Sequence, residues 1–176
     1  MEQFLSALPA TLIQGLIYAL ISLGVYITYS ILDFPDLGVD GTFPLGAAVT
    51  AVLLTKGVSP WLTLPIAMGV GALAGLFTGF IHVRLKVRDL LAGIITMTAL
   101  FSLNLQIAGS NLTIERSTDT IFSSRAVLAL CGDMTLTGRK ILVSLVLVLA
   151  VKLLMDAYLR TKSGLLLRAV GDNASL

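Results

Sequence analysis

Few residues in this chain could bind a metal or cross-link the fold. The 176 residues include one cysteine, Cys131, and one histidine, His82. One cysteine cannot form a disulfide within the chain, and no Cys or His cluster has metal-binding spacing, so the sequence predicts no metal site. The chain also lacks the Gly-x-x-x-x-Gly-Lys-Ser/Thr loop that cradles nucleotide phosphates. We therefore expect no catalytic residues and no cofactor bound by this chain.

Charged side chains are also scarce. Only 12% of the residues are charged, whereas 56% are hydrophobic, and the mean hydropathy of +0.95 is far above that of soluble domains. The net charge is only +2, and the basic residues lie beside apolar runs rather than among aromatic residues. This pattern argues against a nucleic-acid partner. The composition predicts an integral membrane protein whose main surroundings are the lipid bilayer.

Long apolar runs predict an all-α, polytopic transmembrane bundle. Four runs, residues 8–32, 61–83, 90–108 and 141–159, approach the length of about 20 residues that a helix needs to cross a bilayer. Residues 42–55 are too short to cross alone at about 1.5 Å per residue, and they predict a half-helix. The N-terminus lacks the basic region of a cleaved signal peptide. We expect about five membrane segments, one of them short or broken.

Basic residues near the ends of these runs predict the orientation. Six of them follow two of the predicted spans: Arg84, Lys86 and Arg88 after residues 61–83, and Arg160, Lys162 and Arg168 after residues 141–159. Because short loops rich in Lys and Arg stay in the cytoplasm, both groups are expected there. Residues 109–139 are then expected outside, and counting back places the N-terminus outside as well.

Residues 33–44 interrupt the helical pattern. They hold three carboxylates, two prolines and two glycines between apolar runs, and such a segment is not expected to form a continuous helix. Broken helices in transporters commonly line substrate sites. Asp33, Asp36 and Asp40 are therefore candidate pathway residues. An ordinary cytoplasmic loop with solvated aspartates is the alternative, and the spacing favours neither.

A glycine stripe lies on the second long run. Gly71, Gly75 and Gly79 are spaced four apart, so they share one helical face. Small residues on one face let a neighbouring helix approach closely. We predict that this stripe packs against another helix, either within the subunit or across a dimer.

A polar stripe lies on the third long run. Thr98, Ser102 and Gln106 are again four apart, whereas Asn104 lies off this stripe. Polar side chains in a span either bond to neighbouring helices or line a wet path. The stripe therefore adds three candidate pathway residues, with helix packing as the alternative.

The end of the chain carries a distinctive pattern. Residues 161–173 read Thr-x-x-Gly-x-x-Leu-Arg-Ala-x-Gly-x-Asn. This pattern resembles the cytoplasmic coupling segment of ABC-transporter permeases of the branched-chain amino acid and ribose type. The likeness extends to residues 15–24, 32–47 and 86–100. The last of these is similar to a subgroup linked to uptake of tryptophan or other aromatic amino acids.

The resemblance implies the permease subunit of an ATP-driven importer for an aromatic or branched-chain amino acid. Residues 160–176 would then form a coupling helix in a groove of a cytoplasmic ATPase, which would use the ATP. The implied coupling residues are Thr161, Gly164, Leu167, Arg168, Ala169, Gly171 and Asn173. Gly164 would permit a sharp exit from the last span. Further implied features are a permease homodimer, an external substrate-binding protein and a bacterial plasma membrane.

The resemblance also sets an expectation for the domain organisation. Residues 1–176 would form a single transmembrane domain that corresponds to the N-terminal portion of the family fold, with residues 160–176 as its cytoplasmic coupling segment. Family members continue past this segment with further spans. We therefore expect a truncated chain or one that another polypeptide completes.

Other functions are compatible with parts of the sequence. An ion-coupled secondary transporter is motivated by the three aspartates of residues 33–44 and by Asp156 within the last predicted span. A membrane scaffold without transport activity would use the glycine stripe. For residues 161–176, the alternative to ATPase coupling is an amphipathic helix that rests on anionic lipid.

Overall fold

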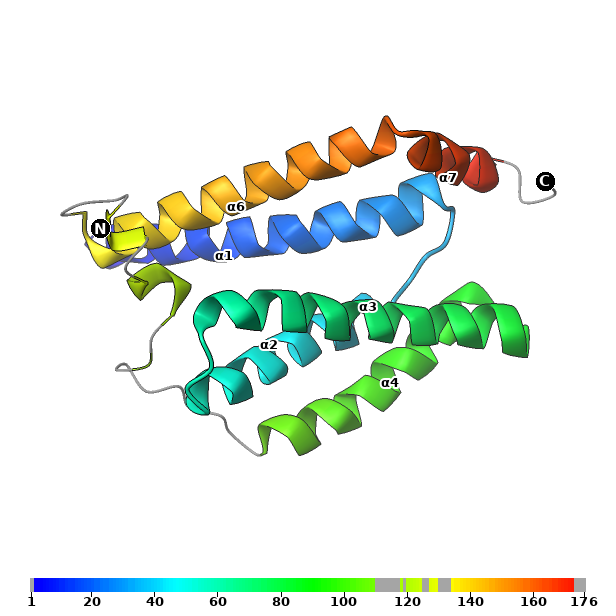
Figure 1. The fold of residues 1–176 in the computed structure, drawn as a ribbon, viewed down its shortest axis with the longest axis horizontal. Helices are drawn as coiled ribbons and strands as arrows, with labels where there is room; N and C mark the ends of the chain where they lie inside the picture. The colour runs from blue at the N-terminus through cyan, green and yellow to red at the C-terminus, as the bar shows by residue number, and fades with distance from the viewer. Residues whose placement is uncertain (1, 110–117, 119, 125–126, 130–133, 173–176) are drawn as a thin grey trace. The chain divides into compact units, whose positions relative to one another are not determined.

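The computed structural model describes residues 2–109, 118, 120–124, 127–129 and 134–172. Within these ranges the regular structure is helical, without β-strands. The elements, in chain order, are α1 (Glu2–Tyr26), the π-helical turn η1 (Ile27–Ile31), α2 (Val39–Thr55), α3 (Pro60–Leu85), α4 (Asp89–Ala108), the 3-10 turn η2 (Ile121–Ser123), α6 (Leu136–Leu159) and α7 (Lys162–Asp172) (Figure 1). The predicted all-α class is confirmed.

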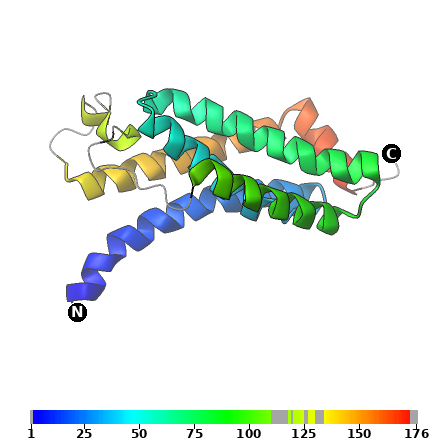
Figure 2. The same cartoon turned by 90° about the horizontal axis from the view of Figure 1, so that it is seen from below.

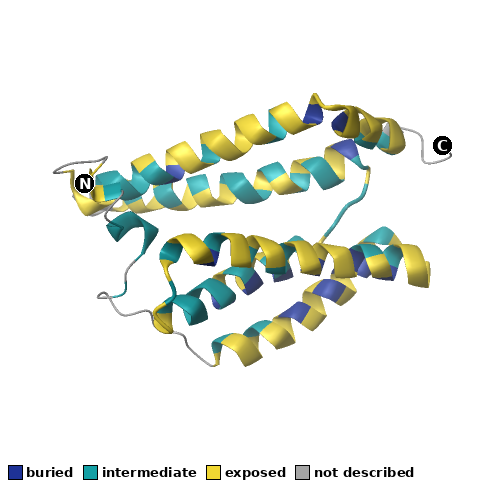
Figure 3. Ribbon diagram, in the orientation of Figure 1, coloured by how far each residue is buried: buried dark blue, intermediate teal, exposed yellow. Residues whose placement is uncertain are grey.

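Four helical segments in the described part of the chain are long and apolar enough to cross a membrane. They are Ala7–Ile31, Pro60–Leu85, Asp89–Ala108 and Leu136–Leu159, and each coincides with one of the four predicted runs. Large apolar side chains stay exposed along them, and Figure 3 marks many residues of these helices as exposed. Lipid can cover such side chains, and a helix satisfies its own backbone groups in the bilayer. The predicted multi-pass membrane protein is confirmed.

The half-length helix α2 begins earlier than predicted. It has 17 residues and starts at Val39, three residues before the predicted start at residue 42. Residues 33–44 do not form one continuous helix, as expected, because residues 33–38 are not helical. Pro44 lies in the second turn of α2, where it removes only the backbone bond to the Asp40 carbonyl. The irregular backbone is limited to residues 32–38. The predicted end at Thr55 is confirmed.

The chain separates into two compact units, and each is described by itself. Unit 1 comprises Met1–Asp33 and Arg125–Leu176, and unit 2 comprises Phe34–Ser124. In unit 2, α2 packs against both α3 and α4 around a small apolar core of Leu45, Ala74 and Leu100 (Figures 1 and 2). In unit 1, α1 packs along α6, and α7 contacts both α6 and η1. The single domain expected from the sequence stays a prediction.

Candidate functional site

The first turn of α2 lies beside inner turns of two long helices rather than beside their ends. A Cβ atom added to Gly41 would lie 3.0 Å from the Cα of Met97, which is about 12 Å from the start of α4 at 1.5 Å per residue. A Cβ on Gly38 would lie 3.3 Å from Oγ1 of Thr78, about 10 Å before the end of α3. The break before α2 therefore lies within the length of its two neighbours.

Single glycines make this close approach possible. A Cβ on Gly93 of α4 would lie 2.7 Å from the backbone nitrogen of Leu37 and 3.1 Å from Oδ1 of Asp36. These distances are shorter than ordinary van der Waals contacts, so a larger residue at this position would push the start of α2 away from α4. Gly41 has the same role on the α2 side, because its backbone touches Met97.

Asp36 shapes the turn that leads into α2. Its Oδ1 accepts a hydrogen bond of 2.7 Å from the backbone N–H of Gly38, as in turns that Asp and Asn form with their own backbone. Asp33 belongs to unit 1, where it is exposed with a left-handed φ of 51°. The three predicted aspartates thus have different surroundings, and Asp40 is the one that borders a groove.

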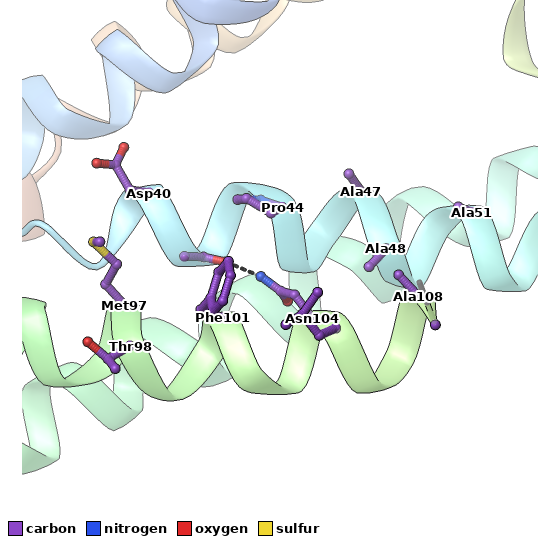
Figure 4. Close-up of a pocket in the computed structure, with 13 residues that line it drawn as sticks. Asp40, Pro44, Ala47, Ala48, Ala51, Met97, Thr98, Phe101, Asn104 and Ala108 are labelled. Carbon is purple, nitrogen blue, oxygen red and sulfur yellow. Dashed lines mark hydrogen bonds between the residues drawn. The ribbon is translucent and has the colours of Figure 1, made fainter. Parts of the chain in front are cut away.

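This groove lies between α2 and α4 of unit 2 and has a volume of about 660 Å³ (Figure 4). Its lining is mostly small and apolar: Gly41, Pro44, Ala47, Ala48, Ala51, Met97, Phe101, Leu105, Ala108 and Gly109. Its polar lining residues are Asp40, Thr98 and Asn104. Figure 4 places Asp40 toward one end of the groove. An apolar groove with a few polar groups is typical of small-molecule sites.

Asn104, which lies off the predicted polar stripe, reaches from α4 to α2. Its Nδ2 donates a hydrogen bond of 3.1 Å to the Gly41 carbonyl, as the dashed line in Figure 4 marks. Its Oδ1 is buried without a hydrogen-bond partner among the described residues. A buried amide oxygen without a donor is costly. In the sequence, Asn104 could have been singled out because a carboxamide within an apolar span is costly without a polar partner.

The predicted polar stripe divides between the groove and the exposed surface. Thr98 lines the groove, and its hydroxyl donates to the Ile94 carbonyl at 2.8 Å. Ser102 and Gln106 are exposed and are not lining residues of the groove. A pathway role for these two therefore gains no support from the groove and stays a prediction.

The glycine stripe on α3 is open in this chain. A Cβ atom added to Gly71, Gly75 or Gly79 would meet nothing within 4 Å, so no described residue packs closely against these backbones. The predicted packing within the subunit thus gains no support. Packing against a second subunit stays a prediction.

Helix α7 carries the predicted coupling residues. The hydroxyl of Thr161 accepts a 3.3 Å hydrogen bond from the N–H of Gly164 and donates one of 2.6 Å to the Tyr158 carbonyl. Thr161 therefore caps the start of α7. Asn173 lies outside the described residues.

One face of α7 packs against the rest of unit 1. Gly164, Leu167 and Gly171 share this face, and Gly164 is buried. A Cβ on Gly164 would lie 2.5 Å from the Cα of Leu159, and one on Gly171 would collide with the Ile31 carbonyl. Gly164 is not among the glycines with positive φ. It therefore permits the close corner between α6 and α7 through its lack of a Cβ rather than through a positive φ, and its expected role in a sharp exit from the span stays a prediction.

The other side of α7 is exposed. Ala169 and Arg168 are exposed, together with the apolar side chains of Leu165, Leu166 and Val170. At the corner with α6, a second pocket of about 500 Å³ is lined by Asp156, Leu159, Arg160, Leu165 and Arg168. The predicted coupling residues thus divide into an inner set that holds α7 in place and an outer set that is accessible.

Four apolar spans, a half-length helix that begins within the length of its neighbours and a capped helix after the last span define a polytopic membrane protein. Comparison with known proteins identifies the family. Residues 8–176 match the family of the permease component of branched-chain amino acid transport systems, and the chain belongs to this family. The predicted family is therefore confirmed.

Three curated relatives cover almost the whole chain. The chain is 38% identical over 172 residues to a tyrosine transport system permease protein of Clostridioides difficile (strain R20291), covering 98% of this chain and 54% of the relative. It is 32% identical to an uncharacterized protein of Rickettsia prowazekii, covering 98% of this chain and 57% of the relative. It is 27% identical to a probable branched-chain amino acid transport permease protein of Methanocaldococcus jannaschii, covering 96% of this chain and 55% of the relative.

The chain thus spans about half the length of the curated relatives it matches. No solved structure matches it significantly.

Proposed function

We propose that this chain forms part of the permease subunit of an ATP-driven importer, that its substrate is an aromatic amino acid, and that the α2–α4 groove lines part of the translocation route. The family supports amino acid transport, and the relative with 38% identity is named for tyrosine transport. The observation that carries the proposal is the groove itself, because it lies beside a helix that begins within the length of its neighbours and displays an exposed carboxylate there.

The position of Asp40 favours a wet surface at this groove. Asp40 precedes Gly41, whose backbone touches Met97 about 12 Å into α4. A carboxylate at such a depth costs several kcal/mol if it faces lipid, about 2.5–3.5 kcal/mol on insertion scales. Irregular backbone is tolerated at membrane depth where it lines a water-filled cavity. A translocation route would supply both the water that solvates the carboxylate and the cavity that the irregular backbone lines.

The outer face of α7 would contact the partner ATPase. Its inner face is held against Leu159 and Ile31 by the close approaches of Gly164 and Gly171, so a displacement of α7 would act on α6 and on the end of the first span. ATP would be bound and hydrolysed by the partner. An external binding protein would deliver the substrate, and the open glycine stripe on α3 would face a second permease copy.

An affinity-tagged chain purified from native membranes tests the coupling, with Ala169→Glu as the disruptive variant. Ala169 is exposed on the side of α7 opposite Gly164 and Gly171, so the new carboxylate would interrupt the docking face without changing its inner contacts. Ser163→Glu is the matched control, because it adds the same charge at the first turn of α7, where an acid is favourable. We expect stoichiometric ATPase with the unaltered chain and the control, and loss of the ATPase with Ala169→Glu.

Uptake measurements separate this function from the ion-coupled alternative. Tyrosine uptake into cells is expected to stop when ATP is depleted and to continue when the ion gradient is collapsed. The opposite result would contradict the proposal and favour a secondary transporter. Retained ATPase in the Ala169→Glu variant would refute the docking role of α7 alone.

A further inference from the structure

Among the described residues, the lining of the α2–α4 groove includes a carboxylate and no cationic side chain. Asp40 lies in the first turn of α2, near the positive end of the helix dipole. The residues that line the groove include Asp40 but no lysine, arginine or histidine. A ligand with a positive charge is therefore the complement of this lining.

Two oxygen atoms of other groups in the lining residues lack the usual donor. Pro44 has no N–H, so it cannot make the helical hydrogen bond to the Asp40 carbonyl. The Oδ1 of Asn104 is buried in the groove wall without a partner among the described residues. A third acceptor is available at Thr98, because its hydroxyl donates to Ile94 and keeps free lone pairs. The polar lining residues therefore carry acceptors rather than free donors.

The remaining lining sets the size and the apolar character of the ligand. A volume of about 660 Å³ lies within the range of small-molecule pockets. Phe101 and Met97 present an aromatic ring and a thioether, and both groups make favourable contacts with an aromatic ring. The small side chains of Ala47, Ala48 and Ala51 leave room beside them.

We propose that the groove recognises the primary ammonium group of an aromatic amino acid, with the Asp40 carboxylate as its ionic partner. An ammonium group carries a positive charge and N–H donors, which match the Asp40 carboxylate. Phe101 and Met97 contact the aromatic part. This inference rests on the proposed function, because it names the chemical group by which the same route selects its substrate.

Binding of radiolabelled L-tyrosine to the full-length protein in lipid nanodiscs tests the site without a mutation. Tyramine keeps the ammonium group and lacks the carboxylate, whereas 3-(4-hydroxyphenyl)propionate keeps the carboxylate and lacks the ammonium group. We expect tyramine to compete with tyrosine and the propionate to compete at least about tenfold less well, since a charge-assisted hydrogen bond is lost. Equal competition by the two compounds would overturn the ammonium site.

The variant Asp40→Asn is expected to weaken tyrosine binding at least about tenfold for the same reason. Asp89→Asn is the matched control: Asp89 also lies in the first turn of its helix, but it does not line the groove. The control is expected to bind as the unaltered protein does, and Asp40→Glu is expected to bind better than Asp40→Asn. Tyrosine binding that is independent of Asp40 overturns this site alone. No tyrosine binding by the unaltered protein overturns the proposed substrate and the site together.

Discussion

The two compact units hold their helices together in different ways. In unit 2, backbones approach at Gly41 and Gly93, and three threonines, Thr63, Thr78 and Thr96, are at most 2% exposed. In unit 1, the apolar window of the first span is 0% buried, and the tight approaches lie at the corner of α7. Unit 2 thus has close packing and polar contacts between its helices. Unit 1 leaves most of its helical surface to lipid or to other chains.

This difference predicts that a small change at a close approach disturbs several helices in unit 2 but only a local contact in unit 1. A new methyl group at a close approach in unit 2 disturbs the packing of α2, which contacts both α3 and α4. The same change at the α7 corner disturbs a local contact of α7 with α6 and η1. Four measurements test this comparison.

The largest effect is expected from Gly93→Ala. Its Cβ would lie 2.7 Å from the backbone nitrogen of Leu37, and overpacking of this kind costs about 1–3 kcal/mol. Thermal unfolding of the purified protein in detergent should show a lower Tm. Gly69→Ala, in α3 but off the glycine stripe, is the control, because its Cβ meets nothing within 4 Å, and it should leave the Tm unchanged or raise it slightly. Equal Tm values for the two variants would refute the close approach.

The next effect is expected from Gly171→Ala. The added methyl group collides with the Ile31 carbonyl, so α7 must move away from η1. Amide hydrogen exchange in α7 should become about tenfold faster, which corresponds to about 1.4 kcal/mol of local stability. Exchange in α2 to α4 should not change. Ala169→Leu, on the exposed side of α7, should keep the exchange of the unaltered protein. A general loss of protection would contradict the local character of this corner.

A smaller effect is expected from Asn104→Leu. The variant loses the hydrogen bond to the Gly41 carbonyl, and the expected loss of stability is about 0.5–1.5 kcal/mol. Denaturant unfolding in detergent measures it. The exposed Ser102→Ala in the same helix should change stability by less than about 0.5 kcal/mol. If the Asn104→Leu variant is as stable as the unaltered protein, the Asn104 bond contributes no net stability.

The smallest effect is expected from the threonine pair that joins α3 to α4. The Thr78 hydroxyl donates to Oγ1 of Thr96 at 3.0 Å, and the Thr96 hydroxyl donates to the Ala92 carbonyl. A double-mutant cycle with Thr78→Val and Thr96→Val should give a coupling energy of about 0.6 kcal/mol, the average for hydrogen bonds between helices in membranes. Strictly additive single variants would exclude this coupling.

The spans could be predicted because the thickness of a bilayer sets the length of an apolar run. The start of α2 could not be predicted in this way. Pro44 and Gly41 suggest that a helix is interrupted at these positions, although α2 already begins at Val39. Close contacts with α3 and α4 stabilise this first turn, and the sequence around residue 39 does not reveal them. For the same reason Pro44 is tolerated at the cost of one backbone bond.

The candidate site could be predicted only in part. Asp40 and Thr98 were found from charge and spacing, whereas Asn104 lies off the regular stripe and contacts α2 through a bond to a residue 63 positions earlier. The regular glycine stripe is open, and the tight approaches involve the isolated Gly41 and Gly93. A glycine's role depends on what faces it across the helix interface. The sequence of one helix does not contain that information.

The π-helical turn at the end of the first span has a consequence for register. Leu32 donates its N–H to the Ile27 carbonyl at 3.1 Å, five residues back, so this turn holds more residues than an α-helical turn. Each residue of an α-helix turns the chain by about 100° and advances it by about 1.5 Å. Loss of the extra residue from this turn would therefore rotate the following backbone by about a quarter turn. The extra residue of the first span therefore lies in the turn whose Ile31 carbonyl closely approaches Gly171 of α7.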